Sequence, residues 1–498
     1  MTTRSADKAA DRLDPALRRL IAILILGAMA PLLDTTIVNV ALNTIVVDLS
    51  TTVSTAQWIG TGYLLAMGMA IPLAGWATGR LGGKRAWLLS LVLFLASSVL
   101  AGIAWDIGSL IAFRVVQGVA SGLMLPILQT LVIQAAAGQG IGRLMAAVSL
   151  PAVVAPILGP VLGGVIVGNT SWRWIFLINV PICVAGLVAA ARGLDTGPRR
   201  PGKPLDLLGL GLLSPGLAAV LFAFSQFAVH RGPTAVAVVV LVAGLVALVG
   251  FVAHALRTGH EPIIDLRLFR VRSFSASTVL LFLSGLSLFG GTLLVPLYLQ
   301  QARHLSAVTV GLLLVPQGIG ALLARRVVGR ITDRVGARPV VLVGILLTVL
   351  PTVAFSQVEQ STSPVVIGLC LLVFGAGVST VSIAVLAAAF TGLDREQVPH
   401  ASGATRILLQ VGGSFGTSVI ALVLAAQTSA HPDALDAAFS TTFWWAAGFA
   451  LVAVLPALLL PRPTPSPSAA AAGPGPSGAD RPGEVANADG GGPTGTGS

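Results

Sequence analysis

The sequence predicts an all-α polytopic membrane protein in which fourteen helices cross the bilayer. The chain of 498 residues is 55% hydrophobic and only 10% charged, with a mean hydropathy of +0.90. A soluble globular protein carries about 25% charged residues, and no soluble core could hide this much apolar surface. The apolar residues also gather into segments of about 20 residues, the length that an α-helix needs to cross a membrane.

The apolar segments follow one another in three groups. The first six cover residues 20–45, 57–77, 86–103, 110–135, 141–167 and 174–190, and two more cover 207–227 and 234–256. The last six cover 275–298, 308–324, 340–358, 365–390, 404–426 and 442–460. The predicted organisation is a cytoplasmic segment 1–19, a six-helix half 20–190, a loop 191–206, two extra helices 207–256, a loop 257–274, a second six-helix half 275–460 and a disordered cytoplasmic tail 461–498.

The basic residues predict the orientation of these helices. Lys and Arg are enriched on the cytoplasmic side of membrane proteins. If the N-terminus is cytoplasmic, most of the 30 Lys and Arg residues fall in cytoplasmic segments, while Arg114 and Arg406 fall inside helices. Both termini are therefore expected in the cytoplasm, in a multi-pass protein of the cytoplasmic membrane. The net charge of +11 is then a topology signal, and no nucleic-acid partner is expected.

An internal repeat relates two cytoplasmic loops. GWATGRLGGKR at residues 75–85 follows the second helix, and GRITDRVGAR at residues 329–338 follows the tenth. If the helices at 207–256 are an insert, helices one to six and nine to fourteen are two copies of one unit, in a 6+2+6 arrangement. Two pseudo-symmetric halves of this kind are typical of transporters whose substrate site lies between the halves.

These motifs resemble those of a known family. The two loops resemble the signature of the major facilitator superfamily, and LIAFRVVQGVAS at residues 110–121 resembles its fourth-helix motif. APILGPVLGG at residues 155–164 resembles the fifth-helix motif of its proton-coupled exporters. LDTTIVNVAL, QWIGTGYLLA and WRWIFLINVPI resemble the 14-spanning drug:proton antiporters, the multidrug efflux type. The chain departs from the family pattern at Gly79, where the first loop normally has an acid, and at Ala155, where the fifth-helix motif normally has glycine.

Two charged residues inside predicted helices are the candidates for proton coupling. Asp34 is the only one of the 19 acids that lies well inside a predicted span. An ionised carboxylate is costly in hydrocarbon, so we expect Asp34 to bind and release a proton; the alternative is that it caps a half-helix that restarts after Pro31. Arg114 needs a partner for the same reason, and Asp34 is a plausible one, direct or through water. The resemblance implies that Arg114 takes part in proton transfer, and the alternative is a pair that only fixes packing.

Polar and aromatic residues nearby are candidates for a substrate cavity. Asn39 lies on a polar stripe of the first helix with Thr35 and Asn43. Gln117 lies one turn from Arg114, and Trp58 and Tyr63 could stack on a lipophilic substrate. The predicted cavity residues are therefore Asn39, Trp58, Tyr63 and Gln117. Hydrogen bonds between helices remain an alternative role for the asparagines, and packing or an interfacial position an alternative for the aromatics.

The fifth-helix motif and the loops are candidates for conformational change. Gly159, Pro160, Gly163 and Gly164 combine small residues with a proline, which favours a close, bent contact. We expect this contact at the interface on which the two halves rock, or alternatively in static packing. A predicted cytoplasmic gate comprises Gly75, Arg80, Gly82, Lys84, Arg85, Gly329, Asp333, Arg334, Gly336 and Arg338. The alternative is that these loops only set the topology.

The resemblance implies a proton-coupled secondary transporter that exports lipophilic drugs, antibiotics or natural products by alternating access. It would need no cofactor besides the proton gradient, and would act as a monomer in the bilayer. The alternatives are uptake by proton symport and a receptor or scaffold without transport. The single intramembrane acid favours neutral, zwitterionic or monocationic substrates, although Arg114 and Arg406 would permit an anion.

Other function classes lack their sequence signatures. The chain has no H-E-x-x-H and no G-x-x-x-x-G-K-[ST] sequence. Its one G-x-S-x-G match, GGSFG at residues 412–416, lies inside the apolar segment 404–426 and not on the strand-to-helix turn that a hydrolase nucleophile needs. Its two cysteines, Cys183 and Cys370, lie in apolar runs without metal-ligand spacing. We therefore expect neither an enzyme, nor an ATP-driven pump, nor a bound metal.

Overall fold

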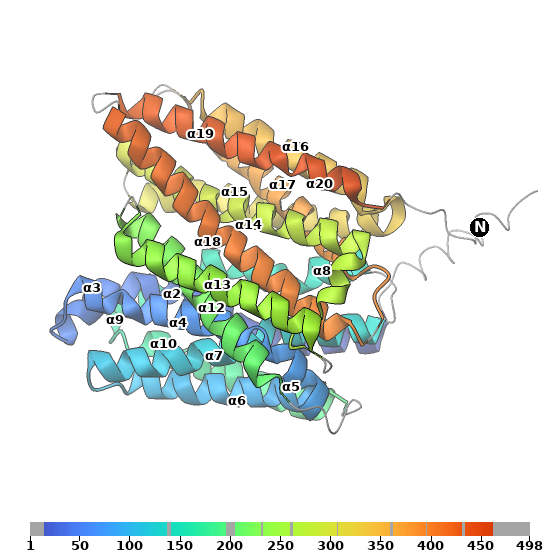
Figure 1. Ribbon diagram of the computed structural model, residues 1–498. Coiled ribbons are helices and arrows are strands. Elements are labelled where there is room, and N and C mark those ends of the chain that lie inside the picture. Colours follow the sequence, from blue (N-terminus) through green and yellow to red (C-terminus); the bar gives the residue numbers. More distant parts are fainter. Residues whose placement is uncertain are drawn as a thin grey trace, which may run out of the picture. The chain divides into compact units, whose positions relative to one another are not determined.

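The computed structural model (Figure 1) describes residues 14–136, 141–195, 205–230, 233–258, 262–305, 307–358, 362–394, 396–430 and 434–461. Within these ranges the chain forms helices joined by turns and loops, with no strand. The predicted all-α class is therefore confirmed for this part of the chain. Most of the predicted N-terminal segment 1–19 and nearly all of the predicted tail 461–498 lie outside the described residues.

In chain order, the helices form three consecutive groups that cover residues 15–193, 207–257 and 266–459. The N-terminal half contains α2 (Pro15–Asp48), α3 (Val53–Ala56), α4 (Trp58–Ala70), α5 (Leu73–Leu81), α6 (Gly83–Gly102), α7 (Ile107–Ala136), α8 (Ile141–Val148), α9 (Leu150–Asn169), α10 (Trp174–Leu177) and α11 (Asn179–Gly193). The middle pair is α12 (Leu207–His230) and α13 (Ala235–Arg257). The C-terminal half contains η1 (Leu266–Arg270), α14 (Arg272–Leu297), η2 (Tyr298–Ala302), α15 (Ala307–Val335), α16 (Ala337–Phe355), α17 (Pro364–Phe390), α18 (Val398–Ala430), α19 (Leu435–Val452) and α20 (Val454–Leu459).

Twelve helical segments of the described chain are long and apolar enough to cross a membrane. A further candidate is the pair α4 and α5, which bends by 56° where Ile71 and Pro72 separate the two helices. The predicted span 141–167 is not among these twelve, and in the structure it is divided into α8 and α9 at Ser149, just before Pro151. Proline cannot donate a backbone hydrogen bond to the preceding turn, so both breaks follow from the local sequence.

The second loop motif, at residues 329–338, is more helical than predicted. Residues 325–335, expected in a loop, continue α15 as far as Val335, and only Gly336 turns the chain into α16. The basic side chains do not stop the helix because its last turns can extend beyond the apolar layer into water. Gly336 has φ 82° and ψ 166°, and Gly82, between α5 and α6, has φ 80° and ψ 150°. The two motifs thus contain the same sharp turn, which the left-handed φ of glycine permits.

The two halves meet through a limited set of helices. In Figure 1 the blue helices of the N-terminal half and the yellow-to-red helices of the C-terminal half lie on either side of green α12. On one side of the interface α8 packs on α15 and α17, and on the other α5 and α7 contact α18. α12 itself packs on α4 of one half and on α18 of the other.

Candidate functional site

Asp34 lies in the middle of α2, in a position with no exposed surface. The helix runs through Pro31 without a break, and the carboxylate contacts side chains of other helices instead of capping a restarted helix. Its Oδ2 forms an ion pair with Nη1 of Arg114 in α7. Its Oδ1 accepts hydrogen bonds from the side-chain amides of Asn179 at 3.2 Å and Gln117 at 3.4 Å. The capping alternative is therefore wrong, and the expected pairing of Asp34 with Arg114 is direct.

Arg114 is 1% exposed, and its guanidinium contacts a carboxylate, an amide, a backbone carbonyl and two aromatic rings. Nη1 also donates to Oε1 of Gln117 at 2.6 Å, and Nε donates to the backbone carbonyl of Ile59 at 3.3 Å. The ring centroid of Tyr63 lies 4.1 Å from the guanidinium carbon, and that of Phe176 lies 5.6 Å away. Cations are attracted to the faces of aromatic rings. The permanent charge of Arg114 is thus compensated by one carboxylate, two polar acceptors and two aromatic rings of the protein.

A second layer of polar groups fixes this cluster. Ser98 in α6 accepts hydrogen bonds from the amides of Gln117 and Asn179, each at 3.1 Å, and donates to the carbonyl of Phe176 at 2.9 Å. The hydroxyl of Tyr63 lies 2.7 Å from that of Ser121. Five helices, α2, α4, α6, α7 and α11, therefore position one carboxylate.

This arrangement makes the net charge of the buried pair depend on whether Asp34 carries a proton. The ionised pair of Asp34 and Arg114 has no net charge, whereas a proton on Asp34 would leave the buried guanidinium without its counterion. Such a change is costly in a medium of low dielectric constant, so protonation of Asp34 favours a rearrangement of the surrounding helices. No group of three or more potential metal ligands occurs among the described residues.

The predicted cavity residues are only partly brought together. Tyr63 and Gln117 are buried within the Asp34 cluster. Trp58 is not, because it is 42% exposed and stacks on Phe222 of α12 with ring centroids 6.0 Å apart. The side chain of Asn39 lies outside the described part of the structure. Asn179 and Ser98 were not predicted from the sequence. The available signal for Asn179 was its place as a lone amide in an apolar run, five residues after Trp174.

The fifth-helix motif packs inside one half. A Cβ atom on Gly159 would lie 1.9 Å from Oγ1 of Thr36, and one on Gly163 would lie 3.0 Å from the side chain of Ile37. Both glycines thus bring α9 close to α2, the helix of Asp34. The small size of these two residues serves the fit of two helices in the same half, while α9 also packs on α15 of the C-terminal half. A role of the motif in rocking of the halves stays a prediction. A Cβ atom on Gly164 would meet nothing within 4 Å, and the side chain of Pro160 is outside the described part.

The second loop motif does join the two halves. Asp333 at the end of α15 accepts hydrogen bonds from the backbone amides of Gly142 at 2.8 Å and Arg143 at 3.3 Å, and from Nε of Arg143 at 3.2 Å. These amides begin α8, where a carboxylate is favoured by the helix dipole. A Cβ atom on Gly329 would lie 2.8 Å from the Cα of Arg143. Two further contacts at the same end are the 3.2 Å hydrogen bond of Thr130 to Ser402 and the approach of Gly75 to Pro399.

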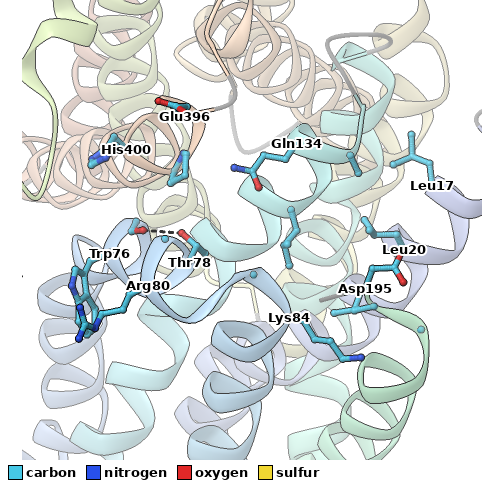
Figure 2. A pocket seen from close by; sticks show the side chains of 18 of the residues that line it. Leu17, Leu20, Trp76, Thr78, Arg80, Lys84, Gln134, Asp195, Glu396 and His400 are labelled. Carbon is cyan, nitrogen blue, oxygen red and sulfur yellow. Dashed lines mark hydrogen bonds between the residues drawn. The ribbon is translucent and has the colours of Figure 1, made fainter. Parts of the chain in front are cut away.

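The first loop motif is arranged differently. Lys84 donates to the carbonyl of Ala191 in its own half at 2.8 Å, and Arg85 is exposed. Gly79 and Arg80 line a cavity of about 910 Å³. Figure 2 shows Arg80, Lys84 and Gln134 around this cavity, with Glu396 and His400 of the C-terminal half also in its wall. In the second motif, Arg334 is exposed and Arg338 half-buried.

The opposite end of the N-terminal half has its own polar cluster. Oδ2 of Asp48, the last residue of α2, accepts hydrogen bonds from the indole of Trp172 at 2.7 Å and from Nη1 of Arg173 at 2.9 Å. These two donors hold the pKa of Asp48 below its usual value. Arg173 also donates to the carbonyl of Ala104 at 3.2 Å. The Trp-Arg-Trp motif thus ties the end of α2 to the loop after α6.

The sequence and the fold both match known proteins. The family model for the Major Facilitator Superfamily matches residues 24–417 and residues 279–486. The chain belongs to the major facilitator superfamily. The fold agrees: the human organic anion transporter MFSD10 superposes with a TM-score of 0.61 at 18% identity, covering 90% of this chain and 100% of that one. The proton:xylose symporter XylE superposes with a TM-score of 0.58 at 15% identity, covering 88% and 94%.

Relatives within the superfamily share more of the sequence. The multidrug resistance protein B homolog of Mycobacterium tuberculosis is 36% identical over 456 residues, covering 91% of this chain and 84% of that protein. The multidrug export protein EmrB of Haemophilus influenzae is 33% identical, covering 84% and 82%. The lincomycin resistance protein LmrB of Bacillus subtilis is 27% identical, covering 88% and 95%.

Proposed function

We propose that this protein exports lipophilic drugs, antibiotics or natural products in exchange for protons. The observation that carries the proposal is the buried pair of Asp34 and Arg114, a titratable carboxylate with a permanent counterion inside a transporter fold. The names of the multidrug and lincomycin resistance relatives support export of antibiotics. Membership of the superfamily makes a membrane transporter the expected class, and an enzyme the less expected one.

The proposed topology has fourteen spans in a 6+2+6 arrangement, with α8 and α9 together forming the fifth span and α4 with α5 the second. Both termini are proposed to be cytoplasmic, in the cytoplasmic membrane of a bacterium. The basic residues of the two loop motifs support this orientation. The protein is proposed to work as a monomer with no cofactor, driven by the proton gradient.

In the proposed mechanism, the two halves rock about a substrate held between them. The contacts of Asp333 with α8 and of Thr130 with Ser402 would hold the cytoplasmic end closed. A proton arriving from outside would bind Asp34, weaken its pairing with Arg114 and favour the rearrangement that opens the cytoplasmic end. There the proton would leave, Asp34 and Arg114 would pair again, and a substrate would enter for export.

A growth assay tests this function. Wild type and Asp34→Asn, at matched protein levels, are expressed in a bacterium without its own efflux pumps and exposed to lipophilic antibiotics, dyes and quaternary ammonium compounds. We expect protection against some compounds from the wild type and none from the variant. Equal protection by both would contradict the role of Asp34. Greater sensitivity of cells with the wild type would instead indicate uptake by proton symport.

A further inference from the structure

Arg406 is an intramembrane cation that the Asp34 cluster does not use. It lies in the ninth position of α18, about 12 Å along the axis from the first residue of the helix. Its neighbours Thr405 and Ile407 are buried, whereas Arg406 is only half-buried. No hydrogen bond or ion pair joins its guanidinium to another described residue. An unpaired charge at such a place is costly, and Arg406 therefore needs a partner that the described chain does not supply.

The face of α18 that carries Arg406 is turned toward the N-terminal half. One turn before Arg406, Ser402 accepts the hydrogen bond from Thr130, and a Cβ atom on Gly403 would lie 3.8 Å from the carbonyl of Ile71. Residues three and four apart share a helix face, so Arg406 lies just past the contacts that close the cytoplasmic end. Tyr63 of α4 is within electrostatic range of its charge.

The next turn of the same face carries Gln410. Its amide is half-buried and, within the described part of the chain, has no hydrogen-bond partner. A guanidinium and an amide therefore follow one another, at i and i+4, on the side of α18 that faces the other half. Together they offer several hydrogen-bond donors to one molecule placed between the halves.

The chain has no spare acid for this face. Among the described residues, Asp34 is the only acid well inside a spanning helix, and it is already paired with Arg114. Within the described chain, the region between the halves thus carries more positive than negative charge: Arg406 has no acidic partner, and Arg325 of α15 bonds only the hydroxyl of Ser149. Such a site favours an anion over a cation, contrary to the sequence-based preference for neutral, zwitterionic or monocationic substrates.

We propose that Arg406 anchors the substrate and that the transported compounds are lipophilic molecules with an acidic group, such as a carboxylate, phenolate or sulfonate. This inference rests on the proposed export function and names its substrate class. The planar guanidinium can donate two parallel hydrogen bonds to a carboxylate, and Gln410 adds a donor one turn away. The inside-negative membrane potential favours outward movement of an anion.

Binding of three matched probes tests the proposal. Pyrenebutyrate, its methyl ester and pyrenebutyl-trimethylammonium differ mainly in charge. Their affinities are measured by energy transfer from the protein's eight tryptophans to pyrene in lipid nanodiscs, with empty nanodiscs as blanks. The proteins are wild type, Arg406→Gln, Arg406→Lys and the control Arg257→Gln, which changes an exposed arginine at the end of α13.

We expect the wild type and Arg257→Gln to bind the acid at least about tenfold more tightly than the ester, as a charge-assisted hydrogen bond predicts. Arg406→Gln should lose this preference while its affinity for the ester stays the same, which also reports that it is folded. Arg406→Lys should keep part of the preference for the acid. This variant provides a second test if Arg406→Gln does not fold. A wild type that prefers the ester or the cation, or a glutamine variant that still prefers the acid, would overturn the proposal.

Binding and transport measurements together distinguish failure of the proposed export function from failure of the proposed role of Arg406. If the wild type binds the acid selectively but moves no drug along a pH gradient, the proposed function is wrong and the role of Arg406 in binding stands. If it exports drugs without selectivity for the acid, only the role of Arg406 is wrong.

Discussion

Asp34 and Arg114 depend on each other, because each would be an isolated charge without its partner. Removing one member of a buried pair typically costs about 3–5 kcal/mol, whereas replacing both can be nearly neutral. We therefore predict that Arg114→Gln destabilises the protein by about this amount, and that Asp34→Asn with Arg114→Gln recovers most of the loss. Thermal unfolding of the purified variants in detergent measures both. Equal stability of the single and the double variant would show that the two charges do not stabilise each other.

Asn179 holds the carboxylate from the side opposite to Arg114. Asn179→Leu keeps the side chain's volume but removes its amide. We predict that it lowers gradient-driven export about tenfold, because a hydrogen bond to a charged group is worth about 1.5–3 kcal/mol. Asn169→Leu is the matched control, because Asn169 is exposed at the end of α9 and bonds only within its own helix. Transport assays in inverted membrane vesicles compare the two; normal export by Asn179→Leu would contradict this role.

Asp48 gives a prediction about pH. Its pKa is lowered in the folded protein, so its bonds with Trp172 and Arg173 contribute stability above the unfolded pKa of about 3.9, and that contribution is lost as pH falls through the folded value. We predict that Asp48→Asn melts slightly below the wild type at pH 7 and at pH 5, and that the difference is smaller at pH 3, below the unfolded pKa. Melting curves at these three values test it. A difference that grows in acid would have the wrong sign.

The sequence predicted the charged centre and two of its neighbours, Tyr63 and Gln117, but not Asn179 and Ser98. Asp34 and Arg114 were recognisable because charges are rare in apolar helices, and that rarity also predicted their pairing. Asn179 and Ser98 are small polar groups that occur widely in membrane helices, so only the packing of α6 against α11 reveals their role. Trp58 was misplaced because its partner, Phe222, belongs to α12, whose position cannot be read from its own sequence.

At the scale of helices, the end proposed to face the cytoplasm is closed by a few contacts between the halves. The hydroxyl groups of Thr130 and Ser402 are 3.2 Å apart, close enough for a disulfide after modest adjustment. We predict that Thr130→Cys with Ser402→Cys, in a background with Cys183→Ala and Cys370→Ala, cross-links under oxidation and stops transport until a reductant is added.

The single-cysteine variants control for damage by the substitutions and the oxidant. Electrophoretic mobility after cleavage of the chain in an exposed loop between α7 and α18 reports the cross-link, and export reports function. A protein that is fully cross-linked yet transports normally would show that this end of the interface need not open.

Helix breaks and extensions were less predictable than the helices themselves. Hydropathy locates apolar segments, but Pro72 and Pro151 divide two of them and only the structure shows by how much the chain bends. Conversely, α15 and α18 extend beyond their apolar segments, because polar residues can continue a helix once it has left the membrane. The small residues of α9 predicted a close contact; that its partner is α2, in the same half, required the tertiary structure.

At the scale of the whole molecule, α12 constrains how the halves can move. Ser214 donates to the carbonyl of Met69 in α4 at 2.7 Å, while the ring of Phe224 lies 5.2 Å from that of Phe415 in α18. Rocking of the halves must therefore break or slide one of these two contacts. The sequence predicted an inserted pair of helices but not this bridging position, because α12 is apolar on all sides and shows no distinct packing face.

The central claim is that Asp34 couples transport to protons, and exchange in liposomes tests it most directly. Purified wild type and Asp34→Asn are reconstituted with a substrate found in the growth assay. Two processes are compared: accumulation driven by a pH gradient, and exchange of labelled for unlabelled substrate without a gradient. We predict that the variant keeps exchange, since the substrate path is intact, and loses accumulation. Accumulation by Asp34→Asn at the wild-type level would contradict the account.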